Sequence, residues 1–179
     1  MGCLQPKEQI ELTFLFVGKD MNLKRIFFPD YLTVKIKKTD KDTIRKSREI
    51  KGKKIELEFQ DFKFDSLEPK QSESKNPSVI IYLCDTEMKK SFDEIKKNNV
   101  IVEQIFPEVT KVIMGFKLTS YQMEVEKKDI EKLAQEIDAY YYYVTEISDI
   151  NGYFADIIKI VLSKIKKAPE MEEGKGCCK

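Results

Sequence analysis

The sequence places a glycine and a lysine where they could bind a phosphate group. Gly18 closes the apolar run Ile10 to Val17, and Lys24 lies six residues further on. In a loop of the form GxxxxGK followed by serine or threonine, backbone amides approach the phosphate, lysine reaches its oxygens and the hydroxyl ligates magnesium. Here Leu23 replaces the second glycine and Arg25 replaces the hydroxyl residue. Alone, this spacing fits an ordinary strand–helix turn better than a phosphate site.

Three further polar residues stand where expected strands end. Asp61 follows the alternating run KIELEFQ, Lys117 follows the apolar run VIMGF, and Thr145 follows the tyrosine-rich run YYYYV. Ligands of an open parallel sheet bind outside the carboxyl ends of its strands. These residues are therefore candidates for one site together with Gly18 and Lys24.

The composition excludes several kinds of chemistry. The 179 residues include no histidine, which removes histidine general bases, histidine-activated nucleophiles and histidine-ligated zinc or haem. Lysine and arginine number 32 against 31 acidic residues, so the net charge of +1 gives no basic field for nucleic acid. Three of the four cysteines, Cys3, Cys177 and Cys178, lie near the chain ends, which does not indicate a disulfide framework.

Strands and helices are expected to alternate. Apolar runs predict buried strands, alternation predicts a strand with one wet face, and apolar residues spaced by three and four predict amphipathic helices. The expected strands are 10–17, 54–59, 79–83, 112–116 and 140–145; the expected helices are 88–98, 126–138 and 153–167, with Asp149 or Asn151 as N-cap of the last. This order indicates one α/β domain with a parallel sheet covered on both faces.

Three segments have simpler interpretations. The basic stretch 35–48 is expected to be a loop grading into an edge strand, and 65–77, with two prolines and three serines, a loop. The run Tyr140 to Tyr143 is expected to be a strand whose rings alternate between core and surface.

The whole pattern resembles the Ras-like small GTPase superfamily, and its Rab branch in particular. Residues 44–61 are similar to the family's interswitch hairpin and the start of its DxxG motif, and YLCDTEMKKSF at 82–92 is similar to its VYDVTDxxSF segment. The resemblance covers residues 10–179. It implies a P-loop small-GTPase-like α/β domain at 9–168, with a mostly parallel six-stranded sheet and helices on both faces. Residues 1–8 would be a flexible segment and 169–179 a flexible tail.

The resemblance implies a nucleotide site at the strand ends, for GTP or GDP with magnesium. Departures from the family's motifs leave no expected catalytic residue and no expected direct metal ligand in this chain. The residues carried over to nucleotide contact are Gly18, Lys24, Arg25, Asp61, Lys117 and Thr145.

Several positions depart from the family's motifs. Leu23 adds a Cβ where the backbone should approach phosphate, and Arg25 offers a cation in place of a magnesium ligand. Phe64 and Asp65 replace the glycine of DxxG and the glutamine that orients water. The guanine-reading NKxD motif appears as FKLT at 116–119, without its asparagine and aspartate. We therefore expect GTP binding and hydrolysis to be weak or absent.

The C-terminal sequence Cys177-Cys178-Lys179 resembles the double geranylgeranylation site of Rab proteins. Two lipid chains hold a protein on a membrane stably, whereas a single chain binds marginally. The other interpretation is a pair of exposed thiols in a frayed tail. At the other end, Gly2 and Cys3 suggest acylation, but Pro6 stands where that pattern needs serine or threonine, which disfavours it.

The leading hypothesis is a Rab-like small G-protein homologue, prenylated and held on the cytosolic face of an intracellular membrane, that acts in vesicle trafficking. Without a secretory signal or an apolar stretch of about 18–20 residues, the chain is expected in the cytoplasm. Its partners would be the membrane, prenyl-transfer and escort proteins and trafficking effectors, and not nucleic acid. One alternative is an atypical but active GTP-binding switch. Another is an unrelated α/β binding module with coincidental terminal cysteines.

Overall fold

The apolar run near the start of the chain forms the central part of a sheet. In β1 (Ile10–Val17), Phe14 and Phe16 pack on one face and Leu15 and Val17 on the other, because successive side chains of a strand point to opposite faces. Such a strand needs cover on both of its faces. The computed structural model describes residues 9–18, 23–24, 26, 43–50, 53–62, 76–119 and 121–165.

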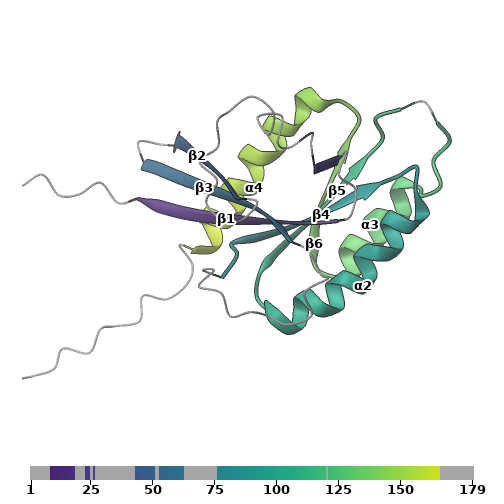
Figure 1. Cartoon of the computed structure of the whole chain (residues 1–179), viewed down its shortest axis with the longest axis horizontal. Coiled ribbons are helices and arrows are strands. Elements are labelled where there is room, and N and C mark those ends of the chain that lie inside the picture. Colours follow the sequence, from purple (N-terminus) through teal and green to yellow (C-terminus); the bar gives the residue numbers. More distant parts are fainter. Residues whose placement is uncertain are drawn as a thin grey trace, which may run out of the picture.

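Six strands form one sheet in the order β2-β3-β1-β4-β5-β6 (Figure 1). The strands besides β1 are β2 (Thr43–Ile50), β3 (Lys53–Phe62), β4 (Val79–Asp85), β5 (Thr110–Phe116) and β6 (Ala139–Val144). β1 is parallel to both β3 and β4, β5 is parallel to both β4 and β6, and β2 pairs antiparallel with β3 at one edge. The expected mostly parallel six-stranded sheet is confirmed.

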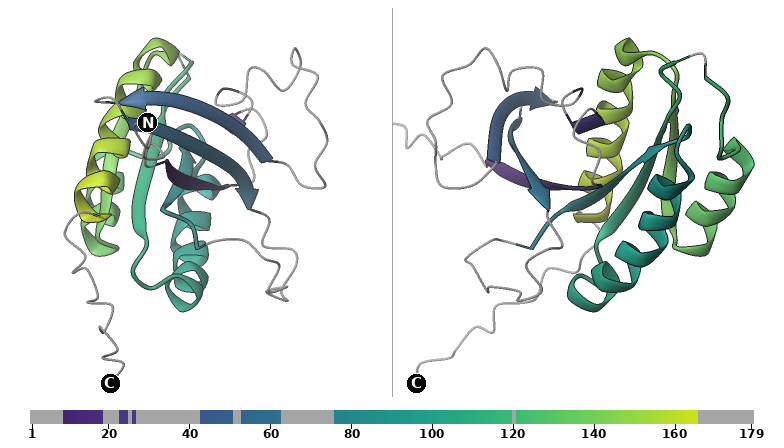
Figure 2. Two further views of the ribbon diagram at one scale, coloured as in Figure 1. Left: turned by 90° about the vertical axis from the view of Figure 1, so that its left-hand side faces the viewer. Right: turned by 45° about the vertical axis from the view of Figure 1, so that its right-hand side comes forward.

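Helices cover both faces of the sheet. Figure 2 shows α4 (Ile150–Ile165) on one face and α2 (Lys89–Ile105) with α3 (Lys127–Glu136) on the other. Phe154 of α4 packs against Phe14 and Phe59 with ring centroids 5.8 Å away in each case. We call this side the α4-side core, and the opposite side the α2/α3-side core, which includes Phe92 and Ile130.

The element boundaries differ from expectation at several places, including the end of α2 and the start of α4. α2 continues to Ile105 rather than ending at residue 98, because Val102 extends its apolar face into the core. α4 begins at Ile150, after the short 3-10 helix η2 (Ile147–Asp149), because Ile150 is buried in the α4-side core. Asn151 therefore lies inside the helix and is not its N-cap, whereas Asp149 directly precedes it.

The strand β2 occupies much of the stretch expected to grade from loop into edge strand. Most of its side chains are exposed, and it is held by backbone pairing with β3 from Thr43↔Gln60 to Ile50↔Lys53. At the opposite edge the tyrosines of β6 alternate between the two faces of the sheet, and not between core and surface as expected, because helices cover both faces. Tyr141 packs toward the α2/α3-side core, and Tyr142 packs toward the α4-side core.

Candidate functional site

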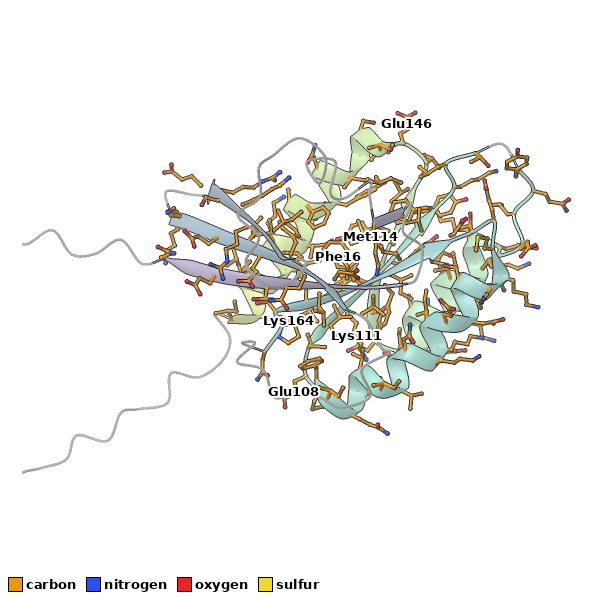
Figure 3. The ribbon with its side chains drawn as sticks, in the orientation of Figure 1. Phe16, Glu108, Lys111, Met114, Glu146 and Lys164 are labelled. Carbon is orange, nitrogen blue, oxygen red and sulfur yellow. The ribbon has the colours of Figure 1, made fainter. Side chains whose placement is uncertain are left out.

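The parallel strands bring five of the six predicted nucleotide-site residues to one edge of the sheet. Gly18 directly follows β1, Asp61 lies one residue before the end of β3, Lys117 directly follows β5 and Thr145 directly follows β6. Lys24 joins them through its contact with Asp61. Figure 3 labels Glu146, beside Thr145, at this edge and Lys164 near the opposite one. Arg25, Cys177 and Cys178 lie outside the described residues.

The backbone turns sharply as it leaves β1. Gly18 has φ +155°, a conformation that residues with side chains rarely adopt. A Cβ at this position would lie 3.4 Å from both the Cβ and the carbonyl oxygen of Leu83 on the neighbouring β4. The glycine is therefore required by local backbone geometry, whether or not a phosphate binds.

Leu23 serves the hydrophobic core. Its side chain is buried in the α4-side core, and half-buried Ile26 packs against the same cluster. In the phosphate-loop pattern this position is a glycine next to the phosphate. Its position in the core explains why an apolar side chain is accommodated there.

A buried ion pair joins Lys24 to Asp61. The Nζ atom of Lys24 donates a hydrogen bond to Oδ1 of Asp61, although the residues are 37 positions apart in the sequence. Their side chains are only 7% and 8% exposed. At this depth water screens the charges little, and removing one partner would leave an uncompensated charge. The sequence predicts a nucleotide contact for Lys24 and for Asp61 separately and gives no indication of this pair.

The end of β5 and the segment after it contain little that can read a base. Phe116 is 1% exposed and belongs to the α4-side core. The backbone N–H of Lys117 donates to the carbonyl of Val144 over 2.9 Å, which keeps β5 and β6 paired to their ends. The hydroxyl of Thr119 donates to the carboxylate of Glu87 and accepts a bond from the backbone N–H of Tyr121.

Thr86 connects the loops that follow β4 and β5. Its side chain is fully buried, and its hydroxyl and N–H both donate to the carbonyl of Phe116, over 2.8 and 3.0 Å. Its own carbonyl accepts bonds from the N–H groups of Glu124 and Val125. Sequence reasoning gave this residue no role. The polar pair Asp85-Thr86 at the end of a buried strand was the available signal.

Ser91 fixes the first turn after β4. Its Oγ accepts a bond from the backbone N–H of Asp85 over 2.9 Å, and Asp85 Oδ1 accepts a bond from the N–H of Glu87 over the same distance. These contacts hold the short loop of residues 86–88 between the end of β4 and the start of α2. The carboxylate of Asp85 is thus used in the turn itself.

Cys84 provides no nucleophile at this edge of the sheet. Its side chain is fully buried in β4. Burial, and secondarily the neighbouring carboxylate of Asp85, raise the pKa of the Cys84 thiol to about 12, against a small lowering from Ser91. The thiol is therefore protonated at neutral pH, and thiolate is the reactive form.

Exposed apolar residues occupy the loops at the same edge. Ile147 is 58% exposed in η2, and Leu118 and Tyr121 are exposed in the loop between β5 and α3. Thr145 and Glu146 are exposed beside Ile147. A groove of about 510 Å³ lies elsewhere, near the ends of the strands opposite to the predicted nucleotide site, between Pro77, Phe106 and Val161.

Comparison with known protein families gives a match over most of the chain. A family model described as the Ras family matches residues 15–165, a span that includes Gly18, Lys24, Asp61, Lys117 and Thr145. The search of curated proteins found no match. Within the described ranges, no helix has the length and apolar character needed to cross a membrane.

Proposed function

This chain belongs to the Ras family of small GTPases, and we propose that it is a Rab-like member with weak or absent GTP binding and hydrolysis. In this proposal, prenylation of Cys177 and Cys178 anchors it to the cytosolic face of an intracellular membrane, where it acts in vesicle trafficking. Family membership removes the hypothesis of an unrelated α/β binding module, because the match covers most of the chain.

The family implies a guanine nucleotide with magnesium, and the residues present do not fit the guanine base. The burial of Phe116 is the observation that carries the proposal: at the position of the family's asparagine it supplies an apolar side chain directed into the core. Thr119 stands in place of the aspartate, and its hydroxyl is bonded to Glu87. Hydrogen bonds to charged groups contribute about 1.5–3 kcal/mol each, so the loss of these contacts weakens base binding by several kcal/mol.

The magnesium ion fits no better. Magnesium prefers oxygen ligands, and Arg25 brings a guanidinium to the position of the hydroxyl ligand. The nearby carboxylate of Asp61 is bonded to Lys24. These residues thus support neither the metal nor the recognition of the base, and with them no step of hydrolysis.

The alternative is an atypical but active GTP-binding switch. The observation that favours it is the gathering of Lys24, Asp61 and Lys117 at one edge of the sheet, in the order of the family's site. In that case Lys117 would pack on the base and Lys24 would bind the phosphates without the other contacts.

Equilibrium titration with fluorescently labelled GDP and GTP separates the two functions. The full chain is titrated with magnesium and again with a chelator, and single-turnover GTP hydrolysis is followed in parallel. We expect dissociation constants no tighter than micromolar and no hydrolysis above the uncatalysed rate. Magnesium-dependent binding in the nanomolar range would establish the active switch instead.

Membrane anchoring is tested on the C-terminal peptide. The full chain is expressed in a eukaryotic host, and mass spectrometry reads the mass added to Cys177 and Cys178. We expect two geranylgeranyl groups and recovery with the membrane fraction; the matched control is the variant with both cysteines replaced by serine. Unmodified cysteines and equal recovery of both proteins from the cytosol would contradict this part of the proposal.

The proposed partners follow from the same assignment. A prenylated Rab-like protein needs an enzyme that transfers the lipid, an escort that shields it from water and effectors on the membrane. Partners that co-purify with the wild type and not with the double serine variant would be those that depend on the lipid.

A further inference from the structure

The ion pair between Lys24 and Asp61 has a consequence for any anion that approaches the phosphate loop. Lys24 is the lysine that would contact phosphate oxygens, and its Nζ is hydrogen-bonded to Asp61 Oδ1. Because both side chains are more than nine-tenths buried, the two formal charges compensate each other locally. A phosphate next to Lys24 would thus meet a pair with no net charge.

The same geometry places a second anion against the phosphate. A phosphate oxygen within reach of Lys24 Nζ would also lie close to the Asp61 carboxylate, because that carboxylate contacts the same nitrogen. Two anions that share one poorly screened cation repel each other. A divalent cation could bridge them, but that route needs an oxygen ligand where this sequence has Arg25.

We propose that the Asp61 carboxylate is an internal anion that binds Lys24 where a phosphate would otherwise bind, and so determines the affinity of this site for anions. Removal of the Asp61 charge should therefore increase anion binding in the absence of magnesium. The inference deepens the proposed function, on which it rests. The effect of Asp61 on the binding of a triphosphate is thus opposite in sign to the effect of a carboxylate that helps to hold a metal. Substitution of a metal-holding carboxylate would weaken binding of a triphosphate.

The test uses inorganic tripolyphosphate as the probe, because it contains no base. Isothermal titration compares the full-length wild type with Asp61→Asn, in a chelator and again in magnesium. We expect Asp61→Asn to bind tripolyphosphate at least about tenfold more tightly than the wild type in the chelator. We expect the gain to be lost in the double variant that also carries Lys24→Gln. Equal or weaker binding by Asp61→Asn would overturn the proposal.

A matched control removes one negative charge from the same strand. Glu58 lies on β3 and pairs with the exposed Arg45 of β2, with 3.3 Å between the oxygen and the nitrogen. Glu58→Gln should therefore leave the affinity for tripolyphosphate within about twofold of the wild type. A gain in Glu58→Gln equal to that in Asp61→Asn would show a general charge effect and refute a specific role for Asp61.

A measurement on the wild type decides the question even if Asp61→Asn does not fold. Acetylation of each lysine by a water-soluble reagent is followed by mass spectrometry, with and without tripolyphosphate in the chelator. We expect slow modification of Lys24 that tripolyphosphate leaves unchanged. Protection of Lys24 by micromolar tripolyphosphate would overturn the proposal. The proposed function fails on a different result, tight guanine-nucleotide binding by the wild type, so the two failures are distinguishable.

Discussion

The contributions of Lys24 and Asp61 to the free energy of unfolding should be strongly coupled, because the two side chains form an ion pair. Both side chains are more than nine-tenths buried, and removal of one partner of a buried pair typically costs about 3–5 kcal/mol because the other charge remains unpaired. We therefore expect Lys24→Met or Asp61→Asn alone to lower the free energy of unfolding by about that amount. For a chain of this size the melting temperature should fall by about 6–20 °C. The double variant should recover most of the loss.

Urea denaturation followed by circular dichroism measures these free energies in a double-mutant cycle. The expected coupling energy is at least about 2 kcal/mol, a value that exposed pairs do not reach. The exposed pair Lys132–Glu136 on α3 supplies the comparison cycle, with more than half of each side chain in water. If the two single losses for Lys24 and Asp61 simply add in the double variant, the buried pair does not exist in solution as described.

Three further predictions concern buried residues of the sheet and of α2. Asn99→Ala should lower the free energy of unfolding, measured by urea denaturation, by about 2–4 kcal/mol, because Asn99 accepts a hydrogen bond from the hydroxyl of buried Tyr82 over 3.0 Å. The same substitution should lower it less when Tyr82→Phe is already present. Burial raises the pKa of the Cys84 thiol from its usual 9.0 to about 12, so between pH 9 and pH 12 the thiol is ionised in the unfolded chain and protonated in the folded one. The free energy of unfolding should therefore fall over this pH range in alkaline denaturation, and Cys84→Ala should lack this part of the fall. Phe116→Asn should lower the free energy of unfolding by about 3–5 kcal/mol, and Phe116→Leu should lower it less. Phe116→Asn should also gain no GDP binding in a titration; GDP binding by this variant would contradict the burial of the side chain.

The elements that carry apolar periodicity could be predicted from the sequence. β1, β4 and β5 are apolar on both faces, and α3 places Ile130, Leu133 and Ala134 on one buried side. Local sequence and burial agree in these elements, so the pattern alone identifies them. Their order along the chain also gave the expectation of a mostly parallel sheet.

The edge strand β2 could be anticipated only in outline. Its sequence TIRKSREI is polar, and among the side chains described in it only Ile44 packs toward the core. Its backbone pairing with β3 depends on a partner strand, which a local pattern does not encode. The boundary of α4 differs for a related reason, because the burial of Ile150 is a tertiary contact.

The candidate site shows the same division between local and long-range information. The positions of Gly18, Lys117 and Thr145 follow from where the strands end. The contact between Lys24 and Asp61 joins residues 37 positions apart, and the bonds of Thr86 depend on how β4 and β5 are aligned. Such contacts arise from the packing of the whole sheet, so residue types could suggest the site but not its internal bonding.

The nucleotide content of the purified chain tests the central claim most directly. Full-length protein is purified in magnesium without added nucleotide, denatured and analysed by anion-exchange chromatography against a known amount of protein. Since buried Phe116 stands at the sequence position of the family's base-reading asparagine and Lys24 is bonded to Asp61, we expect far less than one guanine nucleotide per chain. One GDP or GTP per chain would contradict the account and establish a nucleotide-loaded small GTPase.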